Sequence, residues 1–224
     1  MKRVNIIGGP GTGKSTVSAC LFASLKLLGY DVELVNEWVK SWAWQDIKPT
    51  GYDQLYIFAK QLRREDIILR NGGLIISDAP LVMQLAYVLK HPYTENLRHL
   101  LSVVVNDYEK RYPSVNIRLK REGQYKQKGR FQDEAEAAEM DVLITEQLID
   151  HNIKFESFYP SQLREITDHV VKNLIGDSHG LNSRSDERID ERANEVVGTD
   201  VATGPELVQP RIPDLGNNAG GEAS

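Results

Sequence analysis

Short apolar runs alternate with longer amphipathic stretches along the first 175 residues of the chain. The runs are rich in Val, Ile and Leu, which is typical of strands that are buried on both faces of a sheet. In the stretches between them, apolar residues recur every three or four positions, as they do in helices that pack on one side. The runs predict five strands, at residues 4–7, 31–37, 74–78, 115–119 and 153–158.

The amphipathic stretches predict helices at residues 16–28, 52–70, 81–90, 94–111 and 132–151, and a last helix from Pro160 to about Leu174. Residues 38–51 predict a loop or an irregular helix rich in tryptophan, and residues 120–131 a basic loop interrupted by glycines. Strands that alternate with helices indicate an α/β fold, with a five-stranded parallel sheet and helices on both faces. In such folds, ligands bind outside the carboxyl ends of the strands.

The composition of the chain changes at about residue 176. Residues 176–224 contain few aliphatic side chains and no aromatic ones, so they cannot bury enough surface to order themselves. We therefore predict a folded domain at 1–175 and a disordered acidic tail at 176–224. The first part contains 23 Lys and Arg against 22 Asp and Glu, whereas the tail contains 4 against 10. Because the acidity belongs to the tail, the net charge of −5 does not exclude a nucleic-acid substrate.

Three features bear on the compartment in which the chain works. Its one cysteine, Cys20, excludes an internal disulfide and suits a reducing compartment. There is no run of about 18 apolar residues, so we expect no transmembrane helix. Lys2 and Arg3 precede only four apolar residues before the glycines begin, which is too few for a signal peptide. These features predict a cytoplasmic protein with no membrane partner.

The segment Gly8-Gly9-Pro10-Gly11-Thr12-Gly13-Lys14-Ser15 follows the first predicted strand and matches the P-loop pattern G-x-x-x-x-G-K-[ST]. Its glycines let successive backbone N–H groups point at phosphate oxygens, and the helix that follows adds the positive end of its dipole. Lys14 can contact the β- and γ-phosphates, and the Ser15 hydroxyl can hold Mg²⁺. We predict ATP binding by Gly8, Gly9, Pro10, Gly11, Thr12, Gly13, Lys14, Ser15 and Thr16.

Two carboxylates follow neighbouring strands of the predicted sheet. Asp78 closes the third strand, where it can hold Mg²⁺ or accept a proton, although it could instead cap the helix that begins near Pro80. Glu37 closes the second strand, where it is either a general base or a solvated carboxylate. The sequence does not decide which of the two is the base.

A basic segment precedes the long helix at 132–151. Between Lys110 and Arg130 there are eight basic residues and one acidic residue, Glu122. A resemblance to the nucleoside and nucleotide kinases, set out in the next paragraph, implies that residues 120–131 form a lid. In it, Arg121 and Arg130 would neutralise the charge that develops on a transferred phosphoryl group, since arginine's fork suits phosphate oxygens. An ordinary solvated basic loop is the alternative.

Residues 3–175 resemble the nucleoside and nucleotide kinases, which combine a small domain, one P-loop and a basic lid before a late helix. Thymidylate kinases carry an Asp-Arg pair after this strand, whose arginine grips the acceptor's phosphate. Here Ala79 follows Asp78, which favours a hydroxyl acceptor over a monophosphate. Deoxyribonucleoside kinases place their base at the position of Glu37 and follow it with an aromatic segment, as Trp38, Trp42 and Trp44 do here. The resemblance implies that Glu37 takes the acceptor's proton.

The overall layout resembles phage kinases that act on 5-hydroxymethyluracil in DNA. The features are the segment from Lys2 to Gly11, the strand end at 77–80 and the Gly129-Arg130 pair. The resemblance implies that the γ-phosphate of ATP goes to the hydroxymethyl group of modified thymine in phage DNA, in the host cytoplasm. This step leads toward hypermodified thymidines that protect viral DNA from host restriction. A flipped or single-stranded base would be needed, because a duplex buries the reacting face.

Two further hypotheses remain open. A small-molecule kinase of the deoxynucleoside or nicotinamide riboside type would use the same Glu37, Asp78 and lid. A regulatory module that binds ATP and recruits partners through its tail would need no catalytic carboxylate. Neither the acceptor nor the oligomeric state follows from the sequence.

Overall fold

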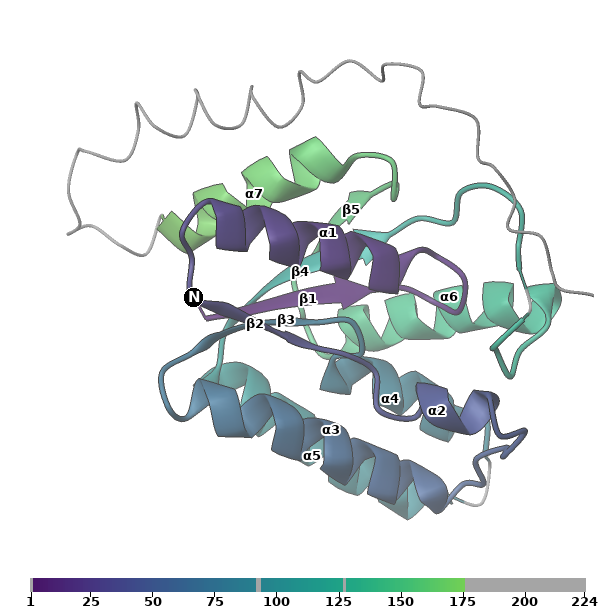
Figure 1. Ribbon diagram of the computed structural model, residues 1–224. Coiled ribbons are helices and arrows are strands. Elements are labelled where there is room, and N and C mark those ends of the chain that lie inside the picture. The colour runs from purple at the N-terminus through teal and green to yellow at the C-terminus, as the bar shows by residue number, and fades with distance from the viewer. Residues whose placement is uncertain (1, 92–93, 127, 176–224) are drawn as a thin grey trace, which may run out of the picture. The chain divides into compact units, whose positions relative to one another are not determined.

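Five parallel strands form one sheet in the order β2-β3-β1-β4-β5 (Figure 1). The computed structural model describes residues 2–91, 94–126 and 128–175. The predicted tail at 176–224 lies outside them. The strands are β1 (Arg3–Ile7), β2 (Val32–Val35), β3 (Leu74–Ser77), β4 (Ser114–Leu119) and β5 (Glu156–Phe158). The predicted α/β fold with a five-stranded parallel sheet is confirmed.

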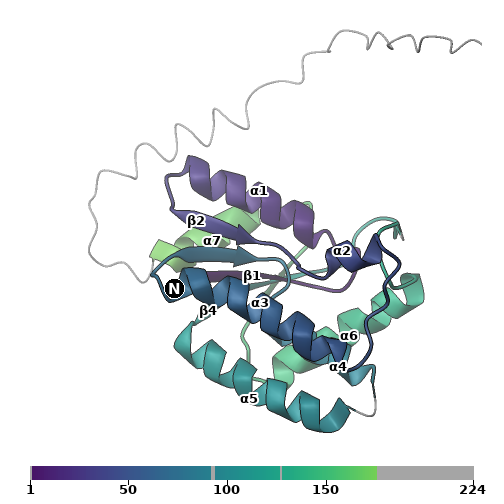
Figure 2. The ribbon, with the colours of Figure 1, turned by 60° about the horizontal axis from the view of Figure 1, so that its bottom comes forward.

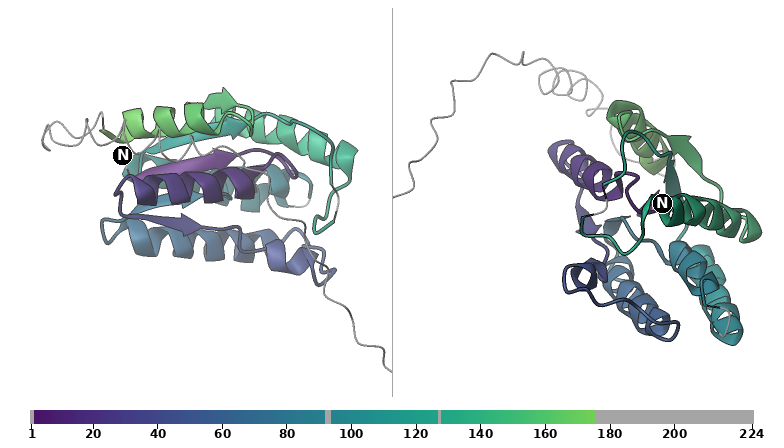
Figure 3. Two further views of the ribbon diagram at one scale, coloured as in Figure 1. Left: turned by 45° about the horizontal axis from the view of Figure 1, so that its top comes forward. Right: turned by 90° about the vertical axis from the view of Figure 1, so that its right-hand side faces the viewer.

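Helices cover both faces of the sheet, as predicted (Figures 1 and 2). Two further views show α1 and α7 on the opposite side of the sheet from α3, α4 and α5 (Figure 3). The helices are α1 (Lys14–Leu27), α2 (Lys40–Ala43), α3 (Asp53–Leu69), α4 (Leu81–Leu89), α5 (Glu95–Arg111), α6 (Glu134–Asp150) and α7 (Leu163–Ile175). Within the described ranges, no helix is both long and apolar enough to cross a membrane.

Strand β1 occupies the centre of the sheet and is buried along its whole length. Val4 and Ile6 belong to the core between the sheet and helices α1 and α7. Ile7 belongs to the core on the other face, against α3, α4, α5 and α6. Apolar residues on both faces explain why this strand is a continuous apolar run in the sequence. The loop that follows β1 is therefore held at the middle of the sheet's carboxyl edge.

The fifth strand is shorter than predicted. The apolar run at 153–158 predicts six strand residues, but only Glu156–Phe158 pair with β4. Ile153 and Phe155 pack against the core without joining the sheet. The carbonyl of Lys154 accepts a hydrogen bond from Asn116 Nδ2 at 3.0 Å. Burial alone thus produces the apolar pattern here, and backbone pairing begins only at Glu156.

Several boundaries near the site also differ from the prediction. β2 ends at Val35, so that Glu37 lies two residues beyond the strand. α1 begins at Lys14 instead of Thr16, because Gly13 already occupies the N-cap position. α7 begins at Leu163, after a turn in which the Gln162 side chain accepts a hydrogen bond from the backbone of Tyr159. The segment at 38–51, predicted as a loop or an irregular helix, agrees with that prediction and contains the four-residue helix α2.

An arginine is buried at the amino end of β1. The Arg3 guanidinium lies 3.8 Å from a Glu65 oxygen, 2.5 Å from a Glu109 oxygen and 4.7 Å from the centre of the Tyr108 ring. Glu65 is fully buried and also accepts a hydrogen bond from the Ser77 hydroxyl at 2.7 Å. Burial raises the pKa of Glu65 above its ordinary value, although Arg3 opposes that shift. Arg3 therefore offsets the cost of burying Glu65.

We expect the change Arg3→Ala to destabilise the fold by about 3–5 kcal/mol, because it leaves the Glu65 carboxylate buried without a counter-charge. Urea unfolding would measure the loss. The matched control is Lys2→Ala, which removes an exposed hydrogen bond to the Gly72 carbonyl and should change stability by no more than about 0.5 kcal/mol. A loss below about 1 kcal/mol for Arg3→Ala would contradict this account.

Candidate active site

The P-loop connects β1 to α1 at the centre of the sheet. Gly13 has a φ of +87°, a left-handed conformation that glycine adopts without strain. A Cβ at this position would also lie 3.1 Å from Pro160 Cβ. Within the loop, the Thr12 hydroxyl and the Lys14 ammonium each donate to the Gly9 carbonyl at 2.9 Å. The sequence pattern and the local geometry thus agree on a phosphate-binding loop.

The Asp141 carboxylate on α6 binds the backbone of the P-loop. The Gly9 N–H donates to Asp141 Oδ1 at 2.6 Å. A Cβ on Gly9 would lie 2.5 Å from that same oxygen and 2.9 Å from the Ala137 carbonyl oxygen, so only glycine fits here. Sequence reasoning missed Asp141, because it is one of several acidic residues on α6 and no motif includes it.

Arg121 belongs to this arrangement and not to the cavity described below. Its Nε and Nη2 donate to Asp141 Oδ2 at 3.0 and 2.6 Å. Its Nη1 donates to the Pro10 carbonyl at 2.8 Å, and Nη2 also donates to the Ala137 carbonyl at 3.1 Å. The guanidinium that we predicted to act on phosphate therefore joins the P-loop to α6.

The two predicted carboxylates meet at the carboxyl edge of β2 and β3. Asp78 follows β3 directly, is buried, and accepts a hydrogen bond from the Glu37 backbone N–H at 2.6 Å. Its own N–H donates to the Val35 carbonyl at 3.3 Å. Pro80 is the N-cap residue of α4, and no side chain caps that helix. The structure therefore does not show the capping alternative for Asp78, which instead fixes the backbone of Glu37.

Glu37 and Lys14 influence each other's protonation. Burial raises the pKa of Glu37, and Asp78 adds to that shift, whereas Lys14 and Lys40 oppose it. Burial lowers the pKa of Lys14, and Arg130 adds to that shift, whereas the nearby carboxylates oppose it. A carboxylate with a raised pKa is a stronger base than one in water. Perturbed pairs of this kind cluster at functional sites.

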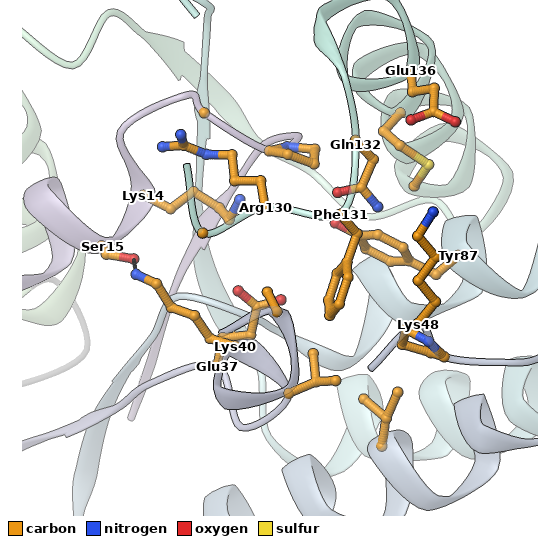
Figure 4. A pocket seen from close by; sticks show the side chains of 18 of the residues that line it. Lys14, Ser15, Glu37, Lys40, Lys48, Tyr87, Arg130, Phe131, Gln132 and Glu136 are labelled. Atoms are coloured by element: carbon orange, nitrogen blue, oxygen red, sulfur yellow. Dashed lines mark hydrogen bonds between the residues drawn. The ribbon is translucent and has the colours of Figure 1, made fainter. Parts of the chain in front are cut away.

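A cavity of about 510 Å³ opens over the P-loop and contains most of the predicted site. Figure 4 shows Lys14, Ser15 and Glu37 around it, with Arg130 extending toward Lys14. Tyr87 and Lys48 lie on the far side from Ser15 (Figure 4). The structure therefore brings Lys14, Ser15, Glu37 and Arg130 together around one space.

The three tryptophans after Glu37 have different surroundings. The Trp38 ring contacts Trp42 and Tyr56 edge to face, with centroids 5.6 and 5.1 Å apart. Trp44 lines the cavity and is 62 % exposed. It lies against Gly129, where a Cβ would be 2.9 Å from its ring. Of the three, only Trp44 borders the cavity, and it does so next to the basic segment at 120–131.

Ser15 and Asp78 are the predicted oxygen ligands of Mg²⁺. Ser15 offers a hydroxyl at the start of α1, and Asp78 a carboxylate at the end of β3. Mg²⁺ prefers one or two protein oxygens together with water and phosphate, so a large protein cluster is not needed. In the described part of the chain, no group of three or more His, Cys, Asp or Glu residues could hold a metal ion by itself. Lys40 Nζ lies 3.5 Å from Ser15 Oγ and brings a further positive charge to this corner.

We expect Asp141→Ala to weaken the binding of a fluorescent ATP analogue by about 1.5–3 kcal/mol, the usual value of hydrogen bonds to a charged group. The change frees both the Gly9 N–H and the Arg121 guanidinium. The control is Glu146→Gln, one turn further along the same helix on its exposed side, which should leave affinity unchanged. Unaltered affinity in Asp141→Ala would show that the loop keeps its shape without this carboxylate.

Comparisons with known proteins agree with the fold. No curated protein sequence matches this chain. Among solved structures, NadR protein in complex with NAD and AMP-PNP is 14 % identical, with a TM-score of 0.59 over 81 % of this chain and 51 % of that one. NadR protein in complex with NR is 16 % identical, with a TM-score of 0.55 over 92 % and 54 %.

The chain thus spans about half the length of these NadR structures, and the likeness at such identities is one of fold. A family model described as AAA domain matches residues 3–163, which is most of the chain. Together with the P-loop at the centre of a parallel sheet, this match shows that the chain belongs to the AAA domain family of P-loop proteins.

Proposed function

We propose that this protein is an ATP-dependent kinase that transfers the γ-phosphoryl group to a hydroxyl acceptor. One observation carries the proposal: Glu37, whose pKa is raised by burial, shares a cavity with the P-loop residues Lys14 and Ser15. A protein that only binds a nucleotide has no need of a desolvated base beside the triphosphate site. A kinase needs a carboxylate there to receive the proton of the attacking hydroxyl.

The proposed reaction is an in-line displacement at the γ-phosphorus. The acceptor oxygen forms a bond to phosphorus, the bond to the β,γ-bridging oxygen breaks, and ADP leaves. The hydroxyl proton passes to the Glu37 carboxylate. Lys14, the loop N–H groups and Arg130 stabilise the negative charge on the phosphoryl oxygens. Mg²⁺, held by Ser15 and by Asp78 directly or through water, would neutralise further charge on the phosphates.

The two lid arginines take different roles in this proposal. Arg130 lines the cavity and lies close enough to Lys14 to lower its pKa, so we assign it to the transferred group. The Arg121 guanidinium binds Asp141 and two backbone carbonyls, so we assign it to positioning the P-loop. Asp78 would hold the metal, and it accepts the hydrogen bond of the Glu37 N–H, so we assign the role of base to Glu37.

For the acceptor, we propose the hydroxymethyl group of 5-hydroxymethyluracil in phage DNA, as a step toward modifications that evade host restriction. The exposed residues Lys40, Lys48, Trp44 and Lys128 border the cavity. Cationic and aromatic side chains together suit an unstacked base on an anionic backbone. Ala79, which follows Asp78, offers no arginine to grip an acceptor monophosphate.

A small nucleoside is the second candidate acceptor. The likeness to NadR favours it, because one of the NadR structures holds NR and the other holds NAD and AMP-PNP. A kinase of the deoxynucleoside or nicotinamide riboside type would use the same Lys14, Glu37 and Arg130. The two candidates differ in whether a polynucleotide must reach the cavity.

An acceptor assay separates these candidates. With γ-labelled ATP, the DNA proposal predicts label on single-stranded DNA that contains 5-hydroxymethyluracil, and none on 5-hydroxymethyl-2′-deoxyuridine or nicotinamide riboside. The same DNA with thymine serves as control and should stay unlabelled. Label on free nucleosides alone would reject the DNA acceptor and support the small-molecule kinase. Lys14→Ala should abolish transfer in either case, because the charge that contacts the β- and γ-phosphates is lost.

The change Glu37→Gln should lower the turnover number by about 10²–10⁴-fold, because no base remains to accept the proton. In the parent protein, activity should fall with decreasing pH through the raised pKa of Glu37, and the variant should lose this acid limb. Glu33→Gln, on an exposed position of β2, is the control and should keep both rate and profile. A loss of only a few-fold, with the acid limb retained, would remove Glu37 from the mechanism.

The same variant has an expected effect on stability. Because burial raises the folded-state pKa of Glu37, its charged form costs free energy in the fold at neutral pH. Glu37→Gln should therefore raise the melting temperature at pH 7, and the gain should shrink as pH falls through that raised pKa. A lower melting temperature at pH 7 would indicate that the carboxylate has a structural role.

A further inference from the structure

Two buried glutamines line the cavity on the side of α3 and α4. Gln54 lies in the first turn of α3 and is 5 % exposed, and Gln84 lies in α4 and is 4 % exposed. They come from separate elements that pack against each other. The mechanism proposed above gives neither of them a role.

Neither side chain makes a hydrogen bond to any residue in the ranges that the structure describes. Gln61, two turns along α3, shows the usual arrangement for a buried glutamine. It is 1 % exposed, and its Nε2 donates to Glu65 Oε1 at 3.2 Å and to Ser77 Oγ at 3.4 Å. Neither carboxamide is among the buried polar atoms that lack a partner in the described residues, so both remain accessible in the cavity. A carboxamide that is open to a cavity and bonded to no other residue points to a ligand that completes its hydrogen bonds.

The cavity that these glutamines line suits a flat ring. Ile57, Tyr87, Phe131 and Met140 line the same cavity and supply apolar and aromatic walls. Figure 4 shows that Phe131 and Tyr87 lie on the side of the cavity away from Ser15. Phosphate would therefore occupy the end near Lys14 and Ser15, and an uncharged ring the end near Phe131 and Tyr87. Glu37 lines the same cavity.

We propose that Gln54 and Gln84 form a subsite that hydrogen-bonds to the amide edge of a planar ring in the acceptor. This inference rests on the proposed kinase function, whose acceptor it describes. A carboxamide presents a donor and an acceptor side by side, so it pairs with a lactam, an imide or another carboxamide through two parallel hydrogen bonds. A sugar hydroxyl presents no such edge. The ring is either a pyrimidine base or a pyridine that carries a carboxamide, and the probes below distinguish the two.

The first experiment measures the free protein. Gln54→Leu and Gln84→Leu should leave the melting temperature unchanged or raise it, because neither change removes a side-chain hydrogen bond to another described residue. Gln61→Leu is the matched control and should lower the melting temperature, because it strips partners from Glu65 and Ser77. A marked loss of stability in both cavity variants would assign the two glutamines to the fold and overturn the proposal.

The second experiment measures ligand binding in the presence of AMP-PNP. The probes are single-stranded DNA that contains 5-hydroxymethyluracil, the same DNA with the N3-methyl derivative of that base, and nicotinamide riboside. At least one ring with an intact amide edge should bind the parent protein, and Gln54→Leu and Gln84→Leu should each weaken it tenfold or more with AMP-PNP affinity unchanged. If the pyrimidine binds, N3-methylation should weaken binding to the parent but add little in the variants. If only nicotinamide riboside binds, the ring is the pyridine carboxamide.

The subsite and the kinase function can fail separately. Ring binding that depends on the glutamines, without phosphoryl transfer to any acceptor, would reject the kinase and keep the subsite. Phosphoryl transfer with equal acceptor KM values in the parent and both variants would keep the kinase and reject the subsite. Failure of the parent to bind any of the rings would also reject the subsite.

Discussion

The burial of β1 on both faces and both edges is the constraint on which the site depends. A strand between two parallel neighbours and two helical layers cannot shift without exposing its apolar residues. The loop that follows it therefore starts from a fixed point. Asp141 then holds the loop through hydrogen bonds from the Gly9 N–H and the Arg121 guanidinium. Asp78 holds Glu37 by accepting a hydrogen bond from its backbone N–H. Rigid supports of this kind let side chains on loops act with the precision that catalysis requires.

The sequence was sufficient for the architecture because its signals are local. Apolar runs, helix periodicity and the P-loop pattern depend on residues that are close along the chain, and they predicted the sheet, both helical layers and the position of Lys14. The predicted strand boundary is wrong where apolar residues are buried but their backbone does not pair in the sheet. Ile153 and Phe155 are apolar because they pack against the core. They were predicted as strand residues, although strand β5 begins only at Glu156.

The parts of the site that sequence reasoning missed depend on contacts between distant residues. Asp141 lies 132 positions from Gly9, and no pattern on an acidic helix marks it. Arg121 was predicted from its charge, but the choice between phosphate and Asp141 depends on where α6 lies beside the loop. Gln54 and Gln84 line the cavity and lack the side-chain partners that Gln61 has, a difference that becomes visible when α3 and α4 are packed together.

The central claim is that the γ-phosphoryl group of ATP passes to a hydroxyl acceptor in this cavity and is not merely hydrolysed. A single-turnover experiment with γ-labelled ATP, which counts ADP, phosphorylated acceptor and free phosphate, tests it most directly. The account predicts one labelled acceptor for each ADP formed, with little free phosphate and no product from Glu37→Gln on the same timescale. ADP accompanied by an equal amount of free phosphate, with no labelled acceptor, would contradict it.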